Sequence, residues 1–104
     1  MAFTIIYSTH PDEETAQKIS NQLLEEKLIA CANIFPIKSA YYWKGNSEND
    51  NEFVSIVKTR NKLATKVEKR ILALHPYEVP AVLRWKVKAN KSYEKWIKAE
   101  TTHP

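Results

Sequence analysis

The chain has 104 residues, a formal net charge of +4 and one cysteine, Cys31. This length predicts one domain over residues 1–104, and one thiol excludes an intrachain disulfide, so we expect the protein in the cytoplasm, where thiols stay reduced. The single glycine excludes glycine-rich phosphate-binding loops. No apolar run reaches the roughly 18 residues of a membrane span. The mixed charges indicate neither a nucleic acid nor a membrane as partner.

The N-terminal part of the chain predicts a strand followed by a helix. Residues 2–8 are mostly β-branched and aromatic, which is typical of a strand. Pro11 and the acids after it favour a helix start, because proline suits the first helical turn and carboxylates suit the positive end of the helix dipole. Either His10 or Asp12 is expected as the N-cap, and apolar residues at helical spacing continue to about Leu28.

The middle of the chain predicts a long hairpin. Residues 29–43 are expected as its first strand, in which Pro36 marks an edge position or a bulge because proline cannot donate a ladder hydrogen bond. Residues 44–46 form a turn signal that leads into an acidic, polar tip over residues 47–52. Residues 53–59 are apolar and β-branched enough to form the third strand of the chain.

A second helix and a fourth strand are predicted next. Asn61 is expected as the N-cap of the helix, whose apolar residues recur at spacings of three and four. The helix should end at His75, because the residue before Pro76 is pushed out of the helical region. Residues 79–87 alternate in a way that favours a fourth strand.

A short helix completes the pattern. It is expected after Asn90 or Ser92, and residues 101–104 are expected to form a tail. The predicted order is β-α-β-β-α-β followed by a helix, which is the ferredoxin-like arrangement of the α+β class. RNA-recognition domains share this order, but the third strand lacks their pattern of glycine and aromatic residues, so no nucleic-acid partner is expected.

Apolar residues on both sides of the strands predict self-association. Two helices can cover only one face of a four-stranded sheet, and soluble monomers rarely expose a large apolar patch. We therefore expect further copies of the chain to cover the other face. The alternative is that the third helix alone covers it. The residues concerned are Ile34, Phe35, Ile37, Tyr41, Tyr42, Trp43, Val54, Ile56, Val57 and Trp85.

Residues 75–80 are the most unusual segment and a candidate binding site. Two prolines bracket His75, Tyr77 and Glu78 and stiffen the backbone that carries them. The functional interpretation is a fixed polar cluster for an ion or a small ligand. The structural interpretation is that His75 ends its helix, where the dipole favours a cation, and that Glu78 pairs with a nearby lysine.

Several further residues are candidates, each with a structural alternative. Cys31 could be a soft metal ligand or a small buried residue. Tyr41, Tyr42 and Trp43 could stack on bases or a planar ligand, or pack in a core or interface. Lys58 and Thr59 could bind an anion or lie at a solvated strand end. One thiol and one imidazole do not make a closed metal site within a chain, although subunits could combine ligands across a symmetric interface.

Several segments together resemble the divalent-cation tolerance (CutA) family. Each segment is weak by itself, but the series follows the family's order over nearly the whole chain and is highly specific. The segments are Thr9 with residues 11–12, then residues 26–34, 42–45, 58–59 and 75–80, and finally Tyr93 with residues 96–97.

The resemblance implies an assembly and a function. It implies a ferredoxin-like homotrimer, similar in architecture to PII signalling proteins, in which the long hairpin reaches onto a neighbouring subunit. The family is associated with tolerance to divalent cations and with copper binding, and no enzymatic reaction is implied. Two hypotheses follow: a trimeric protein that binds Cu(II) or another divalent cation, and a PII-like sensor that binds a small ligand between subunits through Lys58, Tyr77 and Glu78.

The copper ligands that the resemblance implies are only partly present. Ser8 stands where relatives can carry a cysteine, and Leu74 stands where they can carry a second histidine. A neutral hydroxyl binds copper poorly compared with a thiolate. The resemblance therefore leaves His75 as the expected metal ligand, and it implies that the Cys31 thiol lies near His75.

Overall fold

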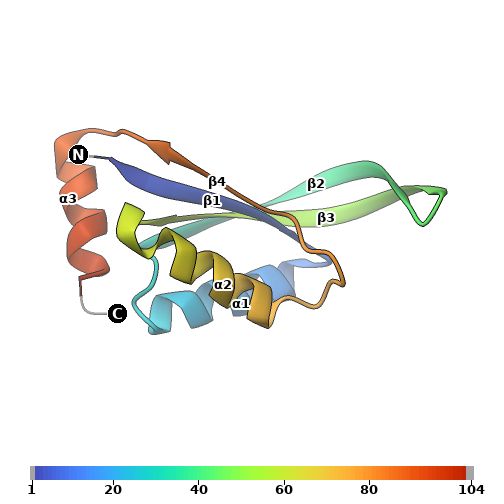
Figure 1. Cartoon of the computed structure of the whole chain (residues 1–104), viewed down its shortest axis with the longest axis horizontal. Coiled ribbons are helices and arrows are strands. Elements are labelled where there is room, and N and C mark those ends of the chain that lie inside the picture. The colour runs from blue at the N-terminus through green and yellow to red at the C-terminus, as the bar shows by residue number, and fades with distance from the viewer. Residues whose placement is uncertain (1, 103–104) are drawn as a thin grey trace.

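A four-stranded sheet with two helices on one face forms the framework of the protein (Figure 1). The computed structural model describes residues 2–102. Its elements are β1 (Phe3–His10), α1 (Glu13–Glu25), β2 (Cys31–Trp43), β3 (Asn46–Thr59), the 3₁₀ helix η1 (Asn61–Leu63), α2 (Ala64–Leu74), β4 (Val82–Val87) and α3 (Lys91–Glu100). The strands lie in the order β2-β3-β1-β4 with antiparallel neighbours, which confirms the predicted ferredoxin-like arrangement and the C-terminal helix.

The main core lies between the sheet and the pair of helices α1 and α2. Side chains alternate along β1, so Ile6 is fully buried under the helices whereas its neighbours Ile5 and Tyr7 lie on the open face. Burying one such aliphatic side chain stabilises the fold by about 1.5–3 kcal/mol. The cluster consists of Ile6, Ile19, Leu23, Leu28, Ile29, Val57, Leu63, Val67 and Ile71. Among residues 2–102, no helix has the length and apolar character needed to cross a membrane.

The two large helices start differently from each other. Asp12 is the N-cap of α1, because its carboxylate accepts a hydrogen bond from the Thr15 amide at 2.7 Å, which decides between the two expected caps. The prediction of Asn61 as the N-cap of α2 is wrong. A 3₁₀ turn precedes this helix, which begins at Ala64, and the Asn61 side chain instead accepts a hydrogen bond from the Thr4 hydroxyl of β1 at 2.7 Å. At the other end, α2 stops before His75, as predicted.

The hairpin of β2 and β3 is longer than predicted. Residues 47–52 were expected as a polar tip, but they belong to β3 and pair with residues 37–42 of β2. The turn is formed by Lys44 and Gly45 alone, with φ angles of 51° and 83°. Two successive positive φ angles are typical of the turn that joins two strands through two residues. The ladder therefore continues through polar residues that do not need a buried face.

Two other boundaries also differ from the predictions. The fourth strand was expected from residue 79 but begins at Val82, since Pro80 cannot donate to the ladder. Asn90 precedes α3, which decides between the two expected caps. Thr101 is not part of a tail: it is fully buried, and its hydroxyl and carbonyl oxygens accept hydrogen bonds from Arg60 at 3.1 and 2.7 Å. The last two residues of the expected tail lie outside the described part of the chain.

The third helix covers only one end of the open face. Ile97 of α3 packs with Phe3 in a small second cluster at that end. Farther along β4, Leu83 and Trp85 remain 50% and 45% exposed. The alternative that α3 alone covers the open face is therefore wrong.

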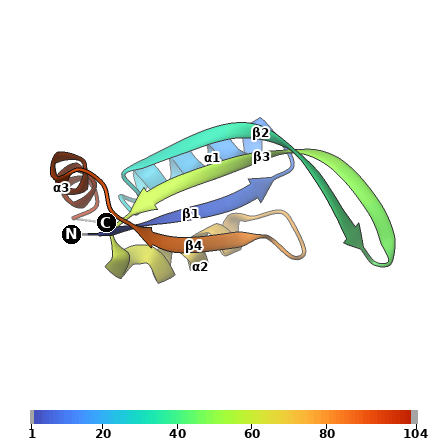
Figure 2. The same ribbon diagram turned by 90° about the horizontal axis from the view of Figure 1, so that it is seen from above.

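The outer half of the hairpin extends beyond the rest of the sheet as a two-stranded ribbon (Figure 2). β1 pairs with β3 only from Phe53 onward, so residues 37–43 and 46–52 have each other as their only ladder partners within the described chain. The ribbon gives the molecule its elongated extents of 45 × 23 × 20 Å. It also leaves strand edges on both sides that can still form hydrogen bonds.

Candidate functional site

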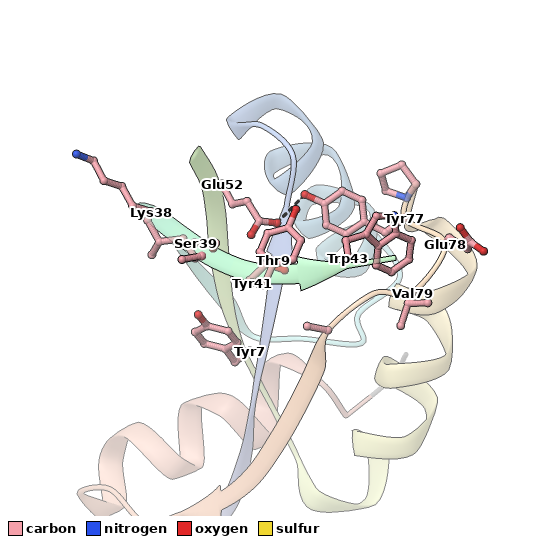
Figure 3. Close-up of a pocket in the computed structure, with 14 residues that line it drawn as sticks. Tyr7, Thr9, Lys38, Ser39, Tyr41, Trp43, Glu52, Tyr77, Glu78 and Val79 are labelled. Atoms are coloured by element: carbon pink, nitrogen blue, oxygen red, sulfur yellow. Dashed lines mark hydrogen bonds between the residues drawn. The ribbon is translucent and has the colours of Figure 1, made fainter. Parts of the chain in front are cut away.

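A cleft of about 860 Å³ opens on the open face where the ribbon leaves the sheet (Figure 3). One wall is the inner part of the ribbon, and the other is the loop between α2 and β4. The residues that line it are Tyr7, Thr9, Ile37, Lys38, Ser39, Ala40, Tyr41, Trp43, Glu52, Pro76, Tyr77, Glu78, Val79 and Ala81.

Glu52 and Tyr77 join the two walls of this cleft. Glu52 lies on β3 and is only 8% exposed, and its Oε2 accepts a hydrogen bond from the Tyr77 hydroxyl at 2.7 Å. Burial and this hydrogen bond raise the pKa of Tyr77 well above its usual value, so the phenol keeps its proton at neutral pH. Nearby, the Tyr41 hydroxyl donates to Asp50, and this hydrogen bond raises the pKa of Tyr41 to about 12. Both phenols are therefore neutral donors.

His75 holds the loop against the end of β1. Its Nε2 lies 2.6 Å from the carbonyl oxygen of Thr9, and its Nδ1 lies 3.1 Å from the backbone nitrogen of Tyr77. Because a carbonyl only accepts and an amide N–H only donates, Nε2 carries the proton and Nδ1 is the acceptor. Both ring nitrogens of His75 are therefore already used by the backbone.

A second imidazole, that of His10, is buried beneath His75. The two rings stack with 4.9 Å between their centroids. Nε2 of His10 lies 3.1 Å from the Ser8 hydroxyl and 3.0 Å from the Ser55 hydroxyl, while its Nδ1 is buried without a hydrogen-bond partner in the described chain. Burial and the neighbouring His75 lower the pKa of His10 from 6.5 to about 4, so this ring is neutral at physiological pH.

Cys31 lies near the other end of the sheet from His75. It pairs with Lys58 of β3, whereas Thr9, the partner of His75, pairs with Val54. The Cys31 sulfur is 3.4 Å from the Tyr93 hydroxyl, to which Lys58 also donates at 3.0 Å. One chain thus does not bring its two expected metal ligands together. Residues 2–102 also contain no group of three or more His, Cys, Asp or Glu side chains that could hold a metal ion.

The other predicted site residues divide between the two ends of the molecule. Trp43, Tyr77 and Glu78 line the cleft, whereas Tyr42 is on the opposite side of the ribbon and is 82% exposed. Lys58 and Thr59 lie at the far end of β3. There Lys58 donates to the Asn33 and Tyr93 side chains, and Thr59 is buried and donates to a backbone carbonyl of Leu28 at 2.6 Å.

Sequence reasoning missed Glu52 and Tyr7 as residues of the cleft, whereas Tyr41, one of the aromatic residues expected to stack on a planar ligand, does line it. Glu52 was assigned to a polar loop, so its side chain had no predicted direction. Its position two residues before Val54 was the available signal, because alternation places both on the same face of a strand. Glu78 does face a lysine, as its structural interpretation expected: Lys44 Nζ lies 3.8 Å from its carboxylate.

The comparisons with known proteins agree along nearly the whole chain. The family model "CutA1 divalent ion tolerance protein" matches residues 4–100. The divalent-cation tolerance protein CutA of Pyrococcus horikoshii is 46% identical over 98 residues, covering 93% of this chain and 96% of that protein. The homologous protein of Thermotoga maritima is 41% identical over 95 residues, covering 90% and 94%. The crystal structure of CutA1 from Ehrlichia chaffeensis superposes with a TM-score of 0.92 at 42% identity, covering 95% of this chain and 94% of that one.

Replacing Tyr77 by phenylalanine tests the junction between the two walls. We expect Tyr77→Phe to lower the free energy of unfolding by about 2 kcal/mol, because a nearly buried carboxylate then loses its hydrogen-bond donor. Tyr42→Phe is the matched control, since the Tyr42 side chain is exposed, and it should change stability by less than about 0.5 kcal/mol. Urea denaturation at fixed protein concentration measures both. Equal effects of the two variants would contradict the role assigned to Tyr77.

The burial of His10 predicts a loss of stability in acid. Its pKa is lower in the folded chain than in the unfolded chain, so the unfolded chain binds the extra proton between pH 6.5 and about 4. The stabilisation is complete above pH 6.5 and is lost as the pH falls through this window, by up to about 3 kcal/mol. Denaturation at several pH values in the presence of EDTA measures it. His10→Asn should flatten the profile between pH 6.5 and 4, and an unchanged profile would assign the acid sensitivity to other groups.

Proposed function

This chain belongs to the CutA1 divalent ion tolerance family, and we propose that it acts in divalent-cation tolerance as a homotrimer without enzymatic activity. The observation that carries the proposal is the family match over residues 4–100, together with relatives that are named divalent-cation tolerance proteins. Some relatives are named as chloroplastic or periplasmic proteins. For this chain we propose the cytoplasm, on the ground that its one cysteine, Cys31, is free.

The ribbon and the open face support self-association. A two-stranded ribbon is only marginally stable in water unless a further element packs against it. Here Phe35 remains 38% exposed on β2, and Leu83 and Trp85 remain exposed on β4. Further copies that accept the ribbon and cover these side chains would remove both problems at once. A closed symmetric ring of three is the arrangement we propose.

Binding of Cu(II) or another divalent cation is the first form of the proposed function, with His75 and Cys31 as its candidate ligands. The residues of one chain do not fit a copper site: both nitrogens of His75 hold backbone partners, and Cys31 lies near the other end of the sheet. Copper binding therefore requires ligands from more than one copy and the release of one His75 hydrogen bond. Imidazole and thiolate are suitable copper ligands once they are released.

Binding of a small ligand in the cleft is the second form, and the size of the cleft favours it. A volume of about 860 Å³ lies in the range of small-molecule sites and far exceeds what one metal ion needs. Trp43, Tyr77 and Glu78 supply aromatic and polar contacts there. Lys58 is not part of the proposed small-ligand site, because it lies at the other end of β3. A thermal-shift panel of metal ions, anions, nucleotides and amines tests it, since a bound ligand stabilises the native state.

Sedimentation at micromolar concentration tests the assembly. We expect three times the mass of one chain, since trimerisation would bury the exposed apolar residues of β4. Trp85→Glu should yield single chains or much weaker association, because it places a charge on the open face. Leu72→Glu is the matched control: Leu72 is similarly exposed at 43% but lies on α2, away from that face, and the mass should not change. A folded wild-type chain that sediments as a monomer would refute the trimer.

Calorimetry with Cu(II) tests the metal form of the proposal. We expect a saturable heat that His75→Gln weakens by about tenfold or more, because the imidazole is the best copper ligand that the chain retains. Cys31→Ser tests the second ligand separately, and circular dichroism checks that each variant is folded. Identical affinity in wild type and His75→Gln would remove His75 from the site.

A further inference from the structure

We propose that the cleft at the base of the ribbon binds a small organic cation, an alkylammonium group, between the rings of Tyr7, Tyr41, Trp43 and Tyr77 with Glu52 as its counter-charge. This inference rests on the small-ligand form of the proposed function and names the chemical class of the ligand. It follows from the chemistry of the cleft walls, from the charge of Glu52 and from the position of Lys44.

The walls of the cleft carry aromatic side chains from several elements. Four aromatic side chains line it, two from the ribbon, one from β1 and one from the loop after α2. The faces of such rings carry negative electrostatic potential and attract ammonium groups within about 6 Å of the ring centroid. Rings from three separate segments can surround a ligand, whereas two rings that stack on each other leave no space between them for one.

Glu52 supplies a carboxylate that has no cationic partner in the described part of the chain. The residue is more than nine-tenths buried, and within the described chain its carboxylate has one hydrogen bond, which Oε2 accepts from Tyr77. Within residues 2–102, no ion pair joins it to a basic side chain. Lys38 is among the lining residues, but Figure 3 shows its side chain extending away from the cleft. A buried carboxylate without a cation is unfavourable, so a positively charged ligand gains the full benefit of this position.

The chain itself places an ammonium group at the rim of the cleft. Lys44 Nζ lies 5.5 Å from the centroid of the Trp43 ring and 3.8 Å from the Glu78 carboxylate. This is the same pair of contacts, an aromatic face and a carboxylate, that the interior offers with Tyr77 and Glu52. At the rim, an aromatic ring and a carboxylate thus hold an ammonium group in the way that we infer for the interior.

A bare divalent cation suits this cleft less well than an organic cation. Such ions take six or more oxygen ligands, several of them from carboxylates. Tyr77 and Tyr41 are protonated and donate to Glu52 and Asp50, so neither phenol is an anionic ligand. Among the described lining residues, that leaves Glu52 Oε1 and the exposed carboxylate of Glu78, which Lys44 already contacts, and these are too few oxygen ligands for such an ion.

Choline and its neutral isostere provide the test. In the isostere a carbon atom replaces the quaternary nitrogen, so the two molecules share shape and differ in charge. Titration of the wild-type protein, followed by calorimetry and by tryptophan fluorescence, should give saturable choline binding and about tenfold weaker binding of the isostere. Equal binding of both molecules would show a merely apolar cleft and would overturn the inference.

Two substitutions locate the binding. Glu52→Gln should weaken choline binding about tenfold while keeping an oxygen that accepts from Tyr77. The matched control is Glu14→Gln on the exposed face of α1, which should leave binding unchanged. Trp43→Leu removes one ring near the turn of the hairpin and serves as a second variant if Glu52→Gln does not fold. Unchanged affinity in folded Glu52→Gln, or in folded Trp43→Leu if the former fails, would overturn the inference.

The panel and the oligomer separate the remaining outcomes. If an anion or nucleotide stabilises the protein and choline does not, the inference fails while the small-ligand function stands; a flat panel removes both. A lysine or arginine of a second copy could supply the same chemistry. In that case choline would bind only to the dissociated Trp85→Glu variant and not to the assembled protein, and this result would also overturn the proposal of a free ligand.

Discussion

The hydrogen bond from His75 Nε2 to the Thr9 carbonyl is the contact on which the cleft depends. It joins the end of α2 to the end of β1, two points separated by 66 residues, while the other ring nitrogen accepts from the Tyr77 amide. Tyr77 is thereby held where its hydroxyl reaches Glu52 on β3. The imidazole can do this only as the neutral Nε2–H tautomer, because a protonated ring has no acceptor for the Tyr77 amide.

The position of His10 beneath His75 extends this constraint into the core. A charge on either stacked ring would be unfavourable for the other, and the buried His10 side chain has only the Ser8 and Ser55 hydroxyls around its Nε2. The local structure is therefore built for two neutral imidazoles. His75 belongs to the loop that forms one wall of the cleft, and it stacks on the acid-sensitive His10 of β1, so stability and cleft geometry are linked through one ring contact.

Local chemistry predicted the order of elements, and long-range pairing decided where the predictions failed. Pro76 correctly ended α2, since its effect acts on the preceding residue alone. Residues 47–52 were placed in a loop, yet a two-residue turn lets polar residues continue a ladder. That error hid Glu52, the central charge of the cleft. Asn61 had the right residue type for a cap, but its side chain binds Thr4 of a distant strand, and no local pattern reports such a contact.

The metal-ligand role proposed for His75 competes with its structural role of holding the loop after α2 against β1. A metal ion that took Nε2 would release the Thr9 carbonyl, and one that took Nδ1 would release the Tyr77 amide. Either change loosens the loop that carries Tyr77 and so weakens its contact with Glu52. The Ser8 hydroxyl lies within hydrogen-bond distance of the buried His10 ring and of Ser55. It provides no thiolate that could replace a lost metal ligand. A metal ion at His75 and an intact cleft would therefore exclude each other, and a ligand in the cleft would oppose metal binding by stabilising the His75 hydrogen bonds.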